Sequence, residues 1–194
     1  RISTYAVETA IARYARDSII TDAEALVYSE AGHVFYCLTF PSAKATWVFD
    51  LTTGIWHERG VWDADAGAFT VWAPRSHCYG FGQHLVGDRT SGQVCTMDTS
   101  YTAECNGDTI RRLRIPPPVF RAPGVRRMFV SRMELVLETG LGTSTGQGVD
   151  PQVMLRSSIN AKTWSHQRLA SAGKQGEYNA QAVWTRLPSS LKMW

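Results

Sequence analysis

The sequence lacks long hydrophobic runs, closely spaced cysteines and a strong excess of either charge. No stretch of its 194 residues approaches the roughly 18 consecutive apolar residues that a membrane-spanning helix needs. The charged start, RISTYAVETAIARYARD, is unlike a signal peptide. A net charge of +3 does not by itself indicate a nucleic-acid-binding protein. We therefore expect a folded globular protein without a membrane partner, as the 44% hydrophobic and 19% charged residues also indicate.

Cysteine is scarce, and its spacing excludes a dense disulfide framework. The four residues contain no C-x-x-C pair, and three of them stand in apolar, strand-like runs. We expect reduced, buried thiols in a protein made in a cytosol. The residues concerned are Cys37, Cys78, Cys95 and Cys105. The chain begins with Arg1 rather than methionine, so we also expect it to be part of a longer protein.

Helical periodicity is confined to the start of the chain. Residues 4–16 place Val7, Ala10 and Tyr14 on one face, and Ser3 or Thr4 could cap this helix. From Ala25 onward, short runs rich in Val, Tyr, Phe, Trp and Thr alternate with turn residues, which is typical of strands. The pattern predicts an all-β chain with one short N-terminal helix. The expected strands lie near residues 25–29, 33–40, 45–50, 54–59, 68–73, 77–82, 84–87, 92–97, 109–114, 127–138, 152–157, 161–171 and 178–187.

One turn sequence occurs twice between these strands. The segments DLTTG, from Asp50 to Gly54, and DRTSG, from Asp88 to Gly92, share the Asp, the central Thr and the Gly, 38 residues apart. Asp can accept bonds from its own turn, and Gly tolerates a positive φ, so each segment predicts a hairpin. A period of about 40 residues with four strands is typical of a β-propeller blade. A β-sandwich stays open as the alternative.

Several longer segments resemble a known family. They are GHVFYCLTFPSAKATWVFDLTTGIWHERG, HLVGDRTSGQV, MELVLETGLG with GQGVDPQVMLR, and GEYNAQAVWTRL, in that order. Together they resemble the packaged-DNA stabilisation proteins of the tail hub in short-tailed phages such as P22, from Arg1 to about Leu187. The family continues further upstream. Two features depart from it: SSINAKTW, which has Ile159 and Ala161 where the family has Asp and Gly, and the ending PSSLKMW, before which we expect the last strands to lack partners.

The resemblance implies the blades of a partial β-propeller followed by a further β region. It implies a structural protein of the virion tail, made in the bacterial host cytoplasm, that stabilises packaged DNA. It also implies a homo-oligomeric ring that contacts the portal or adaptor and the tail needle, close to DNA. No enzyme activity and no cofactor are expected. We divide the chain into residues 1–108, with the helix and blades, and residues 109–194, with a basic connector and the C-terminal β region.

The connector is the most unusual local feature of the sequence. Between Thr109 and Met133 there are seven arginines and no acidic residue, so the rest of the chain sums to −4. The Pro-rich RIPPPVFRAP in its middle cannot form a helix. Two interpretations stay open: a surface for DNA or an acidic neighbour, or a solvated linker paired with acids elsewhere. The candidate contact residues are Arg111, Arg112, Arg114, Arg121, Arg126, Arg127 and Arg132.

Signals for metal binding or catalysis are weak. His77 and Cys78 are adjacent, so they should point to opposite faces of a strand, and no zinc spacing occurs. The Gly-rich GLGTSTGQG has no following Lys and is not a phosphate loop. We therefore predict no catalytic and no metal-binding residues. Two alternative functions remain: a glycan-binding propeller with exposed Trp, and a degenerate sialidase-like hydrolase. The Trp residues stand in or beside strand runs, which favours packing instead.

Overall fold

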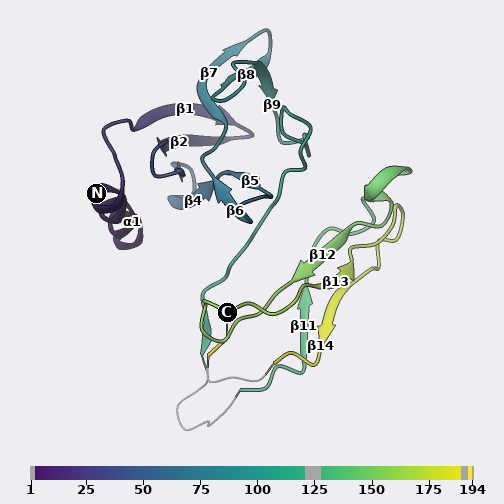
Figure 1. The fold of residues 1–194 in the computed structure, drawn as a ribbon. Helices are drawn as coiled ribbons and strands as arrows, with labels where there is room; N and C mark the ends of the chain where they lie inside the picture. The colour runs from purple at the N-terminus through teal and green to yellow at the C-terminus, as the bar shows by residue number, and fades with distance from the viewer. Residues whose placement is uncertain (1–2, 121–127, 189–191, 194) are drawn as a thin grey trace. The chain divides into compact units, whose positions relative to one another are not determined.

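The computed structural model describes residues 3–120, 128–188 and 192–193 (Figure 1). The chain divides into two compact units, which we call unit 1 (Arg1–Arg112) and unit 2 (Leu113–Trp194). Strands make up most of the regular structure in both units, and the described residues contain a single α-helix, at the start of unit 1. The predicted fold class, all-β with a short N-terminal helix, is confirmed.

The helix α1 (Tyr5–Asp17) packs on unit 1 through one face. Val7 is buried, the Tyr14 ring lies 5.5 Å from the Phe40 ring, and the Trp47 indole donates a hydrogen bond of 3.3 Å to the Tyr14 hydroxyl. Thr4 is the N-cap residue but makes no capping bond with its side chain. Within the described part of the chain, no helix is both long and apolar enough to cross a membrane.

The first sheet of unit 1 is a four-stranded antiparallel meander, as expected for a blade. Its strands run in chain order, and the cross-strand row Leu26, Cys37 and Val48 carries the core, in which Cys37 and Val48 are fully buried. Tyr28 extends this core. The sheet consists of β1 (Glu24–Glu30), β2 (His33–Phe40), β3 (Ala45–Asp50) and β4 (Ile55–Arg59).

The second sheet has three strands, so it is smaller than the first. It contains β7 (Pro74–Gly80), β8 (Gln83–Asp88) and β9 (Val94–Met97), in that order. The predicted strand at 68–73 does not join it: β6 (Ala68–Thr70) pairs with β5 (Val61–Asp63) in a separate hairpin. The β5 strand begins only one residue, Gly60, after the end of β4. The sequence pattern therefore did not distinguish it as a separate strand.

Both predicted D-x-T-x-G turns close hairpins, one between β3 and β4 and one between β8 and β9. Asp50 accepts bonds from the Thr52 amide at 2.9 Å and the Thr53 hydroxyl at 2.7 Å. Asp88 accepts equivalent bonds from the Thr90 amide at 2.9 Å and the Ser91 hydroxyl at 2.5 Å. The two glycines that end these turns have positive φ angles of 71° and 69° at Gly54 and Gly92, respectively, which a residue with a Cβ rarely adopts.

A third turn of the same kind connects β5 and β6, and the sequence comparison missed it. Asp63 accepts bonds of 3.0 Å from the amides of Asp65 and Ala66, and Gly67 has a φ of 62°. The central Thr is replaced here by Asp65. The carboxylate bonds backbone amides, so the turn does not need the hydroxyl side chains of the other two.

Unit 2 is built from strands that pair two at a time in the described residues. The Trp184 indole donates a hydrogen bond of 3.0 Å to the Arg168 carbonyl, and the Arg168 guanidinium donates one of 2.6 Å to the Thr185 carbonyl, so the two strands that contain these residues lie side by side. The pairs are β10 (Val119–Phe120) with β15 (Lys192–Met193), β11 (Arg132–Leu135) with β14 (Ala182–Thr185), and β12 (Gln152–Leu155) with β13 (Arg168–Ser171); a 3-10 turn, η1, spans Gly146–Val149.

Two expectations for this part of the chain are wrong. Residues 109–114 do not form a strand: an isolated bridge joins Ala103 to Thr109, and the prolines that follow offer no backbone donors. The last strands do not lack partners either, because β14 and β15 pair with β11 and β10. The degenerate SSINAKTW segment still forms its turn: Asn160 accepts bonds of 2.8 Å from the amides of Lys162 and Thr163, and Ala161 takes a φ of 59°.

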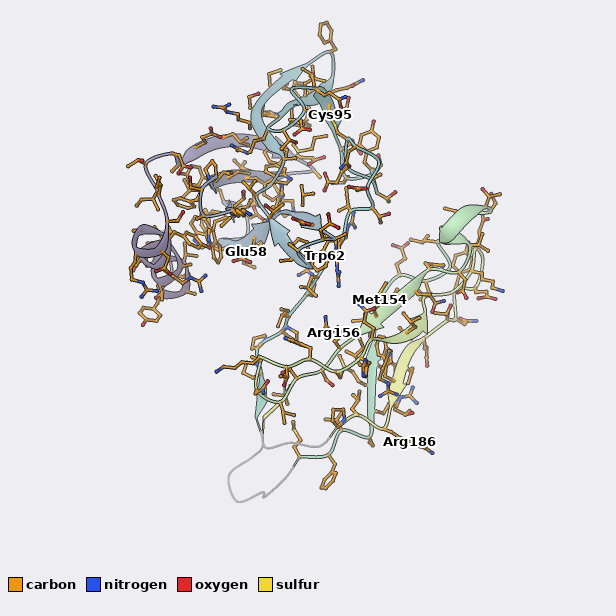
Figure 2. All side chains as sticks on the ribbon, in the orientation of Figure 1. Glu58, Trp62, Cys95, Met154, Arg156 and Arg186 are labelled. Atoms are coloured by element: carbon orange, nitrogen blue, oxygen red, sulfur yellow. A yellow bond between two sulfur atoms is a disulfide. The ribbon has the colours of Figure 1, made fainter. Side chains whose placement is uncertain are left out.

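The cysteines also differ from expectation. Cys37 is buried, as predicted, but Cys78 is exposed because it alternates with His77 along β7 and points away from the core. Cys95 on β9 and Cys105 form a disulfide, with their Cα atoms 6.3 Å apart (Figure 2). Their ten-residue separation in the sequence gave no sign that the loop after β9 returns to that strand.

Candidate functional site

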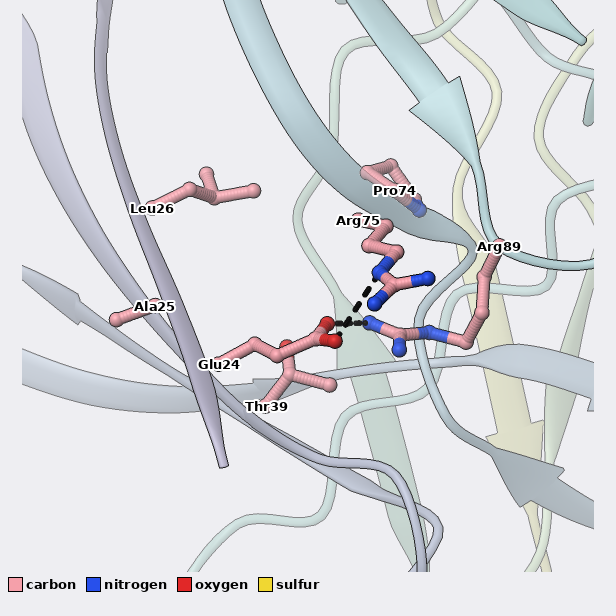
Figure 3. A pocket seen from close by; sticks show the side chains of 7 residues that line it. All are labelled: Glu24, Ala25, Leu26, Thr39, Pro74, Arg75 and Arg89. Atoms are coloured by element: carbon pink, nitrogen blue, oxygen red, sulfur yellow. Dashed lines mark ion pairs between the residues drawn. The ribbon is translucent and has the colours of Figure 1, made fainter. Parts of the chain in front are cut away.

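An ion cluster joins the two sheets of unit 1 (Figure 3). Glu24, the first residue of β1, lies between two arginines of the second sheet. Its Oε1 is 3.1 Å from Arg75 Nε on β7, and its Oε2 is 2.9 Å from Arg89 Nη2. Arg89 follows Asp88, so the second Asp turn holds this guanidinium against β1. One carboxylate thus holds the start of β7 and the residue after β8, both at the open end of this hairpin, against the first sheet.

The two arginines of the cluster differ in exposure. The Arg89 side chain is only 14% exposed, whereas that of Arg75 is 65% exposed. Arg89 Nη2 and Glu24 are close but not aligned as a hydrogen bond, and Arg89 Nε has no hydrogen-bond partner among the described residues. Hydrogen bonds from Ser42 lower the pKa of Asp22, and Arg89 lowers it further. The charges are therefore arranged for attraction between sheets, in a space lined by Glu24, Ala25, Leu26, Thr39, Pro74, Arg75 and Arg89.

A second contact between the sheets is aromatic. The Tyr28 ring on β1 lies 5.5 Å from His77 and 5.8 Å from His84, measured between ring centroids. These two imidazoles stack, with His77 Nε2 2.9 Å from His84 Nδ1. Burial lowers the pKa of His77 and the neighbouring His84 lowers it further, which favours a neutral imidazole between the sheets.

Arg59 also contacts Tyr28. Its guanidinium lies over the rings of Tyr28, Phe35 and Trp72, at 5.6, 4.8 and 5.1 Å from their centroids. It also donates hydrogen bonds to the Tyr28 hydroxyl and to His57 Nε2. Stacking of this kind stabilises a cation without a carboxylate partner. Among the described residues, no group of three or more His, Cys, Asp or Glu is arranged to hold a metal ion.

The first Asp turn is anchored more deeply than the second. Asp50 is buried, and its Oδ2 lies 2.7 Å from His33 Nδ1 at the start of β2. Burial opposes ionisation, but the bonds from Thr53, His33 and Thr52 outweigh it and lower the pKa of Asp50 to about 2. Hydrogen bonds from Ser91 and Thr90 also lower the pKa of Asp88. The four predicted turn residues Asp50, Gly54, Asp88 and Gly92 therefore have the geometry expected of structural turns.

The predicted contact arginines are divided between the units. In unit 1, the Arg111 guanidinium lies 3.8 Å from the centre of the Trp62 ring (Trp62 is labelled in Figure 2), and Arg112 is exposed. In unit 2, Arg114 is exposed, and Arg132 on β11 lies 2.9 Å from Glu134. Within the described part of the chain, Arg112 and Arg114 form no ion pair. Arg121, Arg126 and Arg127 lie outside the described residues.

Two family models match this arrangement of domains. Residues 1–102 match the β-propeller of bacteriophage P22 Gp10, and residues 119–192 match its β-sandwich. The chain belongs to the P22 Gp10 family. This confirms the family resemblance seen in the sequence. It also supports the coarser prediction that the chain is a phage structural protein of the virion. No curated protein matches the chain.

The Gp10 domain models also separate the arginines. Arg111, Arg112 and Arg114 fall between residues 102 and 119, in the interval that neither Gp10 model covers. Arg132 lies inside the sandwich match. Arg112 and Arg114, both exposed and without an ion pair among the described residues, therefore lie in the segment that connects the Gp10 propeller match to the Gp10 sandwich match.

Proposed function

We propose that this protein is a structural component of the phage tail hub, which attaches below the portal or adaptor and holds packaged DNA in the capsid. The observation that carries the proposal is the consecutive match to the Gp10 propeller and sandwich domains, in that order. The protein acts through its surfaces and not as an enzyme. It is made in the bacterial host cytoplasm and works in the virion tail, next to the portal or adaptor and the tail needle.

The inter-sheet contacts support a mechanical role. Propeller sheets that resist a load must not slide past one another, and unit 1 joins its two sheets by the Glu24 ion cluster and by the Tyr28 contact with the histidines. Several copies around an axial channel would close it by adding buried interface below the portal. Rings of identical copies build such interfaces from one repeated surface.

The connecting segment supports an electrostatic contact in that assembly. Arg112 and Arg114 are exposed and have no ion-pair partner within the described residues. A guanidinium forms two-pronged bonds with carboxylates and phosphates, so these side chains suit an acidic neighbour or nearby DNA. Arg111 and Arg132 are partly engaged within their own units, so we assign them smaller roles.

The test is DNA retention. DNA-filled heads of the encoding phage that lack this protein are mixed with the purified protein, and released DNA is followed with a nuclease. We expect the protein to bind the heads and stop the release. Heads that neither bind the protein nor retain their DNA would overturn the proposal.

A double charge reversal tests the contact residues. Arg112→Glu with Arg114→Glu should weaken head binding at least tenfold, more at low salt than at high salt. Lys162→Glu, at another exposed position, is the matched control and should bind as the unchanged protein does. Equal binding by all three proteins would remove the connecting segment from the contact.

A further inference from the structure

The chain between β9 and the end of unit 1 forms a small hairpin. Its two arms are joined by bonds from the Ile110 amide to the Thr102 carbonyl, at 2.9 Å, and from the Glu104 amide to the Asp108 carbonyl, at 2.8 Å. We call residues 102–110 the connector hairpin, because Arg111 and Arg112 follow it and lead into unit 2.

Two anchors hold the connector hairpin to unit 1. The disulfide joins Cys105, in the hairpin, to Cys95 on β9. The Arg111 guanidinium on the Trp62 ring holds the end of the hairpin. Only the first anchor is covalent, and a single cation–π contact between two half-buried side chains is weak by comparison.

The charges near the disulfide oppose it. Glu104 is half-buried; Asp108 belongs to the same hairpin, and Asp88 belongs to the turn between β8 and β9. Burial raises the pKa of Glu104, and the carboxylates of Asp108 and Asp88 raise it further. Above that pKa, Glu104 is ionised against the negative charges of Asp108 and Asp88, so its ionisation weakens the hold of the hairpin on the Asp88 turn.

The other thiols do not compete for this bond. Cys37 is fully buried, and burial raises the pKa of its thiol to about 11, so it forms little thiolate. Cys78 is exposed, but it lies on β7, and β8 separates it from β9. Cys105 is exposed and Cys95 half-buried, so small thiols and disulfides can reach the pair.

We propose that Cys95 and Cys105 form a redox-controlled clasp on the connector hairpin. The oxidised pair holds the hairpin against the repulsion of the three carboxylates, and the reduced pair lets it detach at neutral pH. Reducing compartments favour the open form and oxidising surroundings the clasped form. The clasp thus determines whether the residues just before unit 2 stay attached to β9 of unit 1.

The bond forms by thiol–disulfide exchange with a small disulfide such as oxidised glutathione. One cysteine thiolate attacks a glutathione sulfur, which forms a mixed disulfide and releases one glutathione thiolate. The second cysteine thiolate attacks the protein sulfur of that mixed disulfide and releases the other. Two protein thiols are oxidised, one glutathione disulfide is reduced to two thiols, and the protons of the two cysteines end on glutathione. An excess of dithiothreitol reduces the bond by the same kind of exchange: it forms a mixed disulfide with one cysteine, then closes to its own cyclic disulfide and leaves two protein thiols.

Hydrogen exchange of peptides from residues 98–112 tests the clasp in the full chain. At pH 7.5, reduction should speed exchange of the connector hairpin at least tenfold, while peptides from β2 and β3 do not change. Cys95→Ser should match the reduced protein in both conditions, and Cys78→Ser should behave as the unchanged protein does. Failure of the pair to oxidise in excess glutathione disulfide, or equal exchange in both redox states, would overturn the proposal.

A second variant tests the opposing charges separately. Glu104→Gln removes one of the three charges, so it should restore most of the protection in the reduced protein. The matched control is Asp98→Asn, which removes an exposed carboxylate directly after β9. It should restore none of the protection from exchange. If Glu104→Gln leaves exchange of the reduced hairpin unchanged, carboxylate repulsion does not open the clasp.

Discussion

Units 1 and 2 are both built from antiparallel strands, but they hold them together differently. In unit 1, four strands share one continuous ladder around the buried Val48, and the second sheet adds three more. In unit 2, the described strands pair two at a time, and Trp184 and Arg168 bridge the pairs through bonds to backbone carbonyls. Where ladders are narrow, side-chain bonds to the backbone replace the missing strand neighbours.

Two glycines of unit 2 that have a positive φ are also closely packed. A Cβ at Gly173 would lie 2.7 Å from both the Ala180 Cβ and the Glu177 carbonyl, and Gly140 is similarly crowded by Tyr178. In unit 1, the turn glycines Gly54 and Gly92 have open space around them. Unit 1 therefore uses these turn glycines for their backbone angles, whereas Gly140 and Gly173 of unit 2 also leave space for close neighbours.

The largest expected effect tests the bridging side chain. Trp184 is 3% exposed, so Trp184→Ala should destabilise unit 2 by about 4 kcal/mol. Trp184→Phe should cost about 1–2 kcal/mol, because it loses chiefly the indole hydrogen bond. Urea titrations followed by hydrogen exchange of β14 and β3 peptides separate the two units. Equal losses of unfolding free energy in β14 and β3 peptides would mean that the two units unfold together, which would contradict the proposed difference between them.

The ladder core of unit 1 should give the next effect. Val48 is fully buried, and Val48→Ala should cost about 2–3 kcal/mol through the cavity it leaves. Val27 on β1 is 56% exposed, so Val27→Ala should change the free energy of unfolding by less than about 0.5 kcal/mol. Urea unfolding measured on β3 peptides compares the two variants. Similar costs would show that burial in this ladder does not carry the stability of unit 1.

Two glycine substitutions compare backbone angle with backbone crowding. Gly54→Ala should cost about 1–2 kcal/mol, because only its positive φ of 71° opposes a side chain. Gly173→Ala meets the same angular strain, at a φ of 87°, and in addition the contacts at 2.7 Å, so it should cost more. Thermal unfolding of both variants gives the order. A smaller cost at Gly173 would show that unit 2 relaxes around the new methyl group.

The last prediction concerns pH and the two Asp turns. The folded pKa of Asp50, about 2, is below its ordinary value of 3.8. Its carboxylate therefore stabilises the fold fully above pH 3.8, and this contribution is lost as the pH falls from there toward 2. Asp50→Asn should flatten the stability curve of unit 1 in that range. Asp88→Asn, at the more exposed turn, should flatten it less; the opposite order would contradict the role of the bonds from Thr53 and His33 at the first turn.

Sequence reasoning predicted the features that depend on neighbouring residues. The helix α1, the strands β2 and β3 and the two Asp turns follow from periodicity and from side chains that bond within their own turn. Strands β10 and β15 were missed, because each is two residues long and its partner lies far along the chain. Strand 109–114 was predicted wrongly, since an alternating pattern does not supply a neighbouring strand.

The candidate site was predictable only in its composition. The run of arginines is visible in the sequence, but whether an arginine meets Trp62, as Arg111 does, depends on tertiary contacts. The Glu24 cluster was missed because Arg75 and Arg89 are brought to β1 by the packing of one sheet against another. The Cys95–Cys105 bond depends in the same way on a loop that returns to β9.

The pairing of β10 with β15 sets an order of folding. Nearly every strand of unit 1 pairs with the strand made immediately before or after it, so these hairpins can form as the chain leaves the ribosome. The β10 strand must wait for residues 192 and 193, after the rest of unit 2 has been synthesised. Unit 2 therefore completes its fold after unit 1. Until β15 has been synthesised, β10 has no partner strand and can pair with another nascent chain instead.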